Sequence, residues 1–153
     1  MATKLESKAA ALYDADFYVW AERQAELLRA RRFDDLDLEN LVEEVEDLGG
    51  ALKRSALNNA AVIVEHLLKL AHSPAVDPRN GWRSSVREHR RRLQIELTPR
   101  LGQILTDELA AVFAMARQDA AAALRDHGEH AAADVVPAHC PYTVDQITGD
   151  WLP

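Results

Sequence analysis

A regular apolar stripe constrains the fold of this chain more than any other feature. Apolar residues recur at steps of three and four positions, which places them on one face of an α-helix. The stripe keeps its phase across Gly49 and Gly50, although a glycine inside a helix costs about 1 kcal/mol relative to alanine. A loop would not need to preserve the phase, so the pattern predicts one helix from about residue 38 to about residue 72, with two separate helices as the alternative. The stripe comprises Leu38, Leu41, Val45, Leu48, Leu52, Ala56, Asn59, Ile63, Leu67 and Leu70.

Two further predictions concern the glycines and the second half of this helix. We expect Gly49 to lie at a close contact between helices, with Tyr18 and Trp20 as its neighbours, because only a close approach would explain so costly a residue. Residues 60–71 are apolar on nearly every side, which is typical of a helix buried on several faces. We therefore place this segment at the centre of the fold.

The rest of the chain also has helical patterns. Asp14 is the expected cap of a helix that ends near Arg29, Trp82 begins the stripe of a third helix, and residues 106–126 form a long last one that Gly128 ends. Thr143 and Gln146 fit a capping box. The 153 residues contain only 6 Gly and 6 Pro, too few turn formers for most all-β folds. The sequence predicts an all-α fold, a helical bundle of about four principal helices with a long central second helix and a short C-terminal turn.

Length and composition bound the organisation. A chain of 153 residues suits a single domain, 1–153, and we expect residues 1–12 to be flexible or loosely attached. Cys140 is the one cysteine, so no intrachain disulfide forms, as in a reducing compartment. The first residues lack the apolar run of a signal peptide, and no segment has the roughly 20 apolar residues of a membrane span. The expected location is the cytoplasm, without membrane attachment.

Charge is distributed unevenly along the chain. The net charge is −7, which disfavours nucleic acid as a partner of the whole protein. Residues 34–50, the acidic segment, hold eight acids and no base, whereas residues 79–100, the Arg helix, hold seven Arg and two Glu. We expect these two segments to face each other.

Three polar groups are candidates for function. The first lies on the acidic segment, where clustered carboxylates could hold a metal, but the Glu-x-x-His spacing of di-iron bundles is missing. A solvated face that pairs with the Arg helix is the simpler interpretation, and a partner's basic surface is another. The second group contains a predicted i, i+4 ion pair and a histidine that is either a core residue or a ligand or base. The two groups are Glu43, Glu44, Glu46 and Asp47, with Glu39 beside them, and Glu65, His66 and Lys69.

The third group is basic, and comprises Arg83, Arg87, Arg90 and Arg91, preceded by Arg79. These side chains are candidates for binding an anion or a partner, and Trp82 could stack on a base, although its phase favours the core. Near the C-terminus, His127, His130, His139 and Cys140 have spacings that zinc sites use, but without a second cysteine. We predict no metal and no cofactor.

Four blocks of residues together resemble the bacterial domain of unknown function family number 29. The resemblance covers residues from about 12 to 153 and lies in the order and spacing of the blocks. It implies an all-helical fold and an intracellular bacterial protein, and it implies no activity. The blocks are Tyr13, Asp14, Asp16, Phe17, Tyr18 and Trp20; Leu36, Asp37, Asn40, Leu41, Glu43, Glu44, Glu46, Leu48 and Gly49; His66, Leu67, Leu68, Lys69, Pro74, Trp82, Arg83, Arg90 and Arg91; and Cys140, Pro141, Tyr142 and Thr143.

No catalytic motif is recognisable, so the sequence favours a non-catalytic protein-interaction or regulatory module with an unknown protein partner. One alternative is a metal-binding bundle or metal-dependent enzyme that uses the acidic segment and His66. The other is a nucleic-acid-associated regulator that uses the Arg helix.

Overall fold

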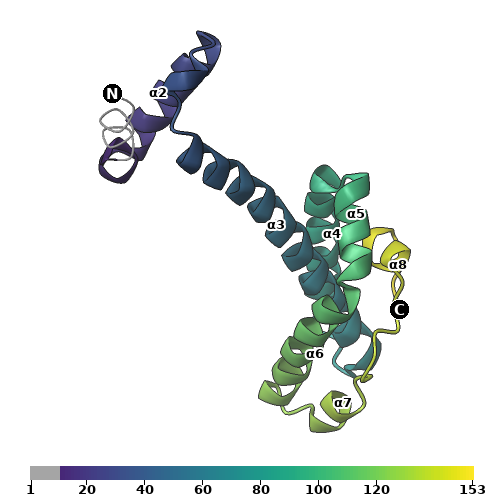
Figure 1. Cartoon of the computed structure of the whole chain (residues 1–153). Helices are drawn as coiled ribbons and strands as arrows, with labels where there is room; N and C mark the ends of the chain where they lie inside the picture. Colours follow the sequence, from purple (N-terminus) through teal and green to yellow (C-terminus); the bar gives the residue numbers. More distant parts are fainter. Residues whose placement is uncertain (1–10) are drawn as a thin grey trace. The chain divides into compact units, whose positions relative to one another are not determined.

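The computed structural model describes residues 11–153, and every regular element within that range is a helix (Figure 1). The prediction of an all-α fold is confirmed. The chain forms two compact units, one that ends at Gly50 and one from Ala51 to Pro153. The prediction of a single domain stays a prediction. The loosely attached N-terminus was expected at residues 1–12, of which residues 1–10 lie outside the described part.

The first unit contains a helical turn at residues 11–15, helix α2 (Phe17–Arg29), the short 3₁₀ helix η1 (Phe33–Asp35) and the start of α3 (Leu38–His72). The cap of α2 is Asp16, whose Oδ1 accepts a hydrogen bond from the Val19 N–H at 3.1 Å. The expectation that Asp14 caps this helix is wrong, because Asp14 lies inside the preceding helical turn and the chain becomes extended only at Asp16.

Helix α3 is continuous over 35 residues and passes both glycines without a break, as the unbroken stripe predicted (Figure 1). The expected close contact at Gly49 is wrong. No heavy atom of the described chain lies within 4 Å of the position that a Cβ would take there, and the residue is exposed. The helix persists because the cost of about 1 kcal/mol for a glycine is small compared with the hydrogen bonding of such a long helix.

The second unit holds the core of the molecule. Its helices are the rest of α3, α4 (Arg79–Glu96), α5 (Pro99–Asp107), α6 (Leu109–Asp126), α7 (His130–Asp134) and α8 (Val144–Thr148). The segment of α3 that was expected at the centre is buried, as predicted. The fully buried side chains include Ile63, Leu67 and Leu68 of α3, Leu93 of α4, Leu105 of α5, Leu124 of α6 and Ile147 of α8.

The boundaries in the second half differ from expectation at one place. Residues 106–126 were expected to form one helix, but α5 already begins at Pro99 and the break comes at Glu108. Proline suits the first position of a helix, where its missing N–H is not needed, and the Thr98 hydroxyl caps the same turn. No helix among the described residues is long and apolar enough to cross a membrane.

Both predicted C-terminal signals are present. Gly128 ends α6 with a φ of +78°, and the Glu129 N–H donates to the Leu124 carbonyl while the Gly128 N–H donates to the Arg125 carbonyl, the pair of bonds of a Schellman motif. Thr143 and Gln146 form the capping box that opens α8. Local sequence therefore sets the ends of these two helices.

Candidate functional site

Three hydrogen bonds join α2 and its preceding turn to the beginning of α3. The indole N–H of buried Trp20 donates to Asp37 Oδ2 at 3.0 Å, and the Asp37 N–H donates to Gln24 Oε1 at 2.9 Å. The Tyr13 hydroxyl donates to Glu44 Oε1 at 2.6 Å, and this bond raises the pKa of Tyr13 to about 12. Glu44, a candidate from the acidic segment, therefore holds Tyr13 against α3.

The same part of α3 carries exposed apolar side chains. Leu38, Val42, Val45 and Leu48 are 60%, 56%, 65% and 67% exposed. Leu38, Val42 and Val45 are separated by four and three positions, and Gly49 follows Val45 by four, so these residues share one face at 100° per residue. We call these residues, together with Leu48 at their edge, the α3 apolar face.

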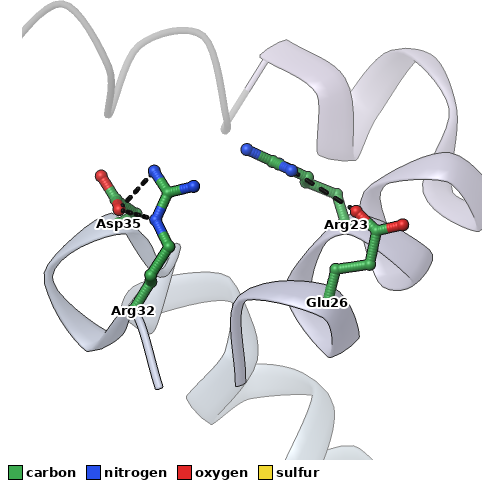
Figure 2. Close-up of polar contacts among 4 residues, drawn as sticks. All are labelled: Arg23, Glu26, Arg32 and Asp35. Carbon is green, nitrogen blue, oxygen red and sulfur yellow. Dashed lines mark hydrogen bonds and ion pairs between the residues drawn. The ribbon is translucent and has the colours of Figure 1, made fainter. Parts of the chain in front are cut away.

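Exposed acids flank the α3 apolar face, with Glu39 and Glu46 nearest to it and Glu43 and Asp47 farther round the helix. Within residues 11–50 the ion pairs are Arg23–Glu26 at 3.4 Å and Arg32–Asp35 at 2.7 Å, and neither uses an acid of α3 (Figure 2). Exposed pairs of this kind contribute no more than about 1 kcal/mol each. The expected pairing of the acidic segment with the Arg helix would join the two units and stays a prediction.

The polar group in the second half of α3 is packed against α4. Lys69 Nζ lies 2.7 Å from Glu65 Oε1, which confirms the predicted ion pair, and 5.6 Å from the centre of the Trp82 ring. His66 Nδ1 is buried without a hydrogen-bond partner among the described residues. Burial, and secondarily the charge of Lys69, lowers the pKa of His66 to about 4. This histidine is therefore neutral at pH 7.

A second polar network crosses from α3 to α4. Asn59, which is buried, places Oδ1 2.8 Å from His89 Nδ1, and its amide donates to Glu96 at 3.5 Å. The Ser55 hydroxyl donates to the same carboxylate at 2.8 Å. Because Asn59 Oδ1 can only accept, His89 carries a proton on Nδ1. These side chains line an open pocket of about 410 Å³.

Arg90, a candidate for binding an anion or a partner, is engaged inside the fold. Its guanidinium is buried and donates to the backbone carbonyls of Ile147 at 2.9 Å, Gln146 at 2.7 Å and Trp151 at 2.7 Å. These carbonyls lie at the end of α8 and beyond it, where no helical partner remains for them. Arg90 therefore attaches the C-terminal segment to α4.

The remaining basic candidates differ in environment. Arg79 donates to the carbonyls of Leu70 at 2.8 Å and Ser73 at 3.3 Å, so it closes the loop after α3. Arg83, Arg87 and Arg91 are exposed, and at intervals of four positions they follow one side of α4. Their role in binding an anion or a partner stays a prediction.

The comparison with known families gives a match over residues 12–152, to the family described as "Domain of unknown function DUF29". The chain belongs to this family. No curated protein and no solved structure matches it. The family assignment agrees with the resemblance seen in the sequence and brings no activity with it.

The C-terminal histidines and cysteine of this DUF29 chain lie in ordinary structural surroundings. Cys140 is half-buried, its Sγ donates to the Tyr142 carbonyl at 3.4 Å, and burial raises the pKa of its thiol. The exposed His127 places Nδ1 2.8 Å from the Ala123 carbonyl. Throughout residues 11–153, no group of three or more His, Cys, Asp or Glu side chains is placed to hold a metal ion.

Sequence reasoning about this DUF29 chain missed two features. The Asn59–His89–Glu96 network escaped because Asn59 was counted as a member of the apolar stripe. A polar residue in phase with buried positions signals that a partner must satisfy it, and that signal was present. The exposure of the α3 apolar face also escaped, because periodicity shows which side chains share a face and not whether anything covers them.

Proposed function

We propose that this DUF29 domain is a non-catalytic protein-interaction module that binds a protein partner through the α3 apolar face. One observation carries the proposal: four large apolar side chains lie close together on a regular helix, and each is more than half exposed. Scattered exposed apolar residues are normal on protein surfaces, but contiguous ones mark interaction sites.

Energetics support the same function. Burying a Leu or Val side chain contributes roughly 1.5–3 kcal/mol, so four of them supply a substantial part of a binding energy. The helix that carries the face is also held in place, because Trp20 bonds to Asp37, just before α3, and Tyr13 bonds to Glu44. A helix that is fixed before binding loses less entropy when a partner docks.

Site-specific photo-crosslinking in cells that express the protein naturally tests this function. A photoreactive residue at Val45 should capture one defined partner, because Val45 lies in the middle of the face. The substitution Leu48→Glu should abolish that crosslink by placing a charge in the apolar contact. Ile95→Glu is the matched control, since Ile95 is a highly exposed apolar residue of α4.

Two results would contradict the proposed function. The first is the absence of any defined crosslinked partner at Val45. The second is a crosslink that survives Leu48→Glu as well as it survives Ile95→Glu, because the apolar face would then not be the contact.

A further inference from the structure

We propose that the partner of the α3 apolar face is a basic amphipathic helix, and that it approaches α3 most closely at Gly49. This inference rests on the proposed function and adds the partner's chemistry and the geometry of the contact. Three observations carry it: the apolar row, the glycine within it and the nearby acids, which form no ion pair within residues 11–50.

The presence of a glycine at position 49 needs an explanation. Gly49 lies in the interior of α3, where it costs about 1 kcal/mol relative to alanine. Nothing in the described chain requires the missing side chain, since no heavy atom lies within 4 Å of the position of a Cβ. A glycine on an exposed apolar face lets a second helix come nearer than the usual interaxial distance of roughly 8–10 Å. A closely docked partner helix explains this glycine.

The shape of the face suits a helix. From Leu38 to Gly49 the row runs along three turns of α3, roughly 17 Å at 1.5 Å per residue. Leu38, Val42, Val45 and Gly49 recur at steps of four and three, the pattern that a partner helix matches with its own residues at the same steps. The face belongs to one helix, so it offers a stripe and not a deep pocket.

The negative charge of the acidic segment favours a basic partner helix over an acidic one. The acidic segment holds eight acids and no base, and none of the ion pairs within residues 11–50 uses an acid of α3. A second copy that docked by the same face would bring two such segments together, and like charges across an interface are unfavourable. A helix with Lys or Arg beside its apolar row gains from the same charges, and this gain weakens as salt screens it.

Two synthetic helical peptides of roughly 20 residues test the charge requirement. Both carry the same apolar row, and one has Lys beside that row where the other has Glu. In fluorescence anisotropy at low salt, the basic peptide should bind at least about tenfold more tightly than the acidic one, and its affinity should fall as salt rises. The combined substitution Glu39→Gln and Glu46→Gln should reduce this preference.

The substitution Gly49→Leu tests the close approach. It meets no atom of the described chain, so the variant should fold with at least wild-type stability, while the leucine should weaken binding of the basic peptide by at least about tenfold. Gly81→Leu is the matched control. Gly81 lies in α4, equally without a neighbour within 4 Å of a Cβ, and this variant should bind like the wild type.

Several outcomes would overturn the inference. Equal binding of the two peptides, or no binding of either, contradicts a basic helix as the partner. Wild-type affinity in Gly49→Leu contradicts the close approach. A dimer in light scattering that Val45→Glu dissociates makes a second copy the occupant.

The failures of the two proposals differ. If the partner crosslinked at Val45 contacts the face through an acidic or non-helical segment, this inference fails and the interaction function stands. If no partner crosslinks there, the function itself fails.

Discussion

His66 lies in a buried environment that disfavours protonation of its imidazole. The pKa of about 4 lies below the ordinary value of 6.5, so below pH 6.5 the unfolded chain binds a proton that the folded chain does not. The stabilisation is complete above pH 6.5 and is lost as the pH falls towards 4, by up to about 3 kcal/mol. We predict that His66→Leu removes this part of the pH dependence, measured as unfolding free energies in urea between pH 7 and pH 4.

The control for this prediction is His130→Gln, which changes an exposed histidine at the start of α7. It should keep the pH dependence of the wild type. Equal pH profiles for His66→Leu and the wild type would mean that His66 binds a proton as readily in the folded as in the unfolded chain, and would reopen a role for it as a ligand or base.

Replacing Gly49 or Gly128 with alanine should change the stability of the protein in opposite directions, because the two glycines have different backbone conformations. Gly49 lies inside α3 with open space around it, so we predict that Gly49→Ala stabilises the free protein by about 1 kcal/mol. Gly128 follows α6 with a φ of +78°, where a Cβ is strained, so Gly128→Ala should destabilise by about 1 kcal/mol. Urea midpoints of the two variants measure both effects, and a destabilised Gly49→Ala would show that the chain itself uses the space.

Arg90 determines how α8 is attached to α4. Because its guanidinium donates to three backbone carbonyls, we predict that Arg90→Met costs about 3 kcal/mol of unfolding free energy. Methionine keeps much of the apolar stem, so the loss of unfolding free energy reports mainly the hydrogen bonds.

Limited proteolysis gives a second test of Arg90→Met, and it should cut the variant after residue 140. Arg91→Met, which changes an exposed neighbour, should remain resistant, and resistance of both variants would contradict the role of Arg90.

At the scale of the whole molecule, burial is concentrated in one unit. Every residue of the main core lies between Ala56 and Ile147, whereas within residues 11–50 the buried side chains are Trp20, Gln24 and Leu27. Fewer buried contacts allow local opening at lower free energy. We predict that hydrogen exchange measured by mass spectrometry is faster in α2 than in α6, and equal protection of the two helices would contradict this.

The contacts that could be predicted from the sequence are those between residues a few positions apart. The Glu65–Lys69 pair follows from a spacing of four on a helix, and the length of α3 follows from a stripe that stays in phase. The partners of Arg90 were not predictable, because they lie more than 50 positions away in the sequence and are backbone carbonyls without side-chain identity. Asn59 was similar, since its partner His89 lies on another helix.

The all-helical fold, the continuity of α3, the buried segment around Ile63 and Leu67, and the helix end at Gly128 all follow from the amino-acid sequence, because periodicity and backbone preference act within a few residues. Which parts of the apolar stripe are covered depends on the packing of the helices. The same spacing of three and four runs through Leu38, Val45, Ile63 and Leu67, yet the first two are exposed and the last two are fully buried. Burial depends on which other helices pack against each turn, and that is a property of the whole chain in three dimensions.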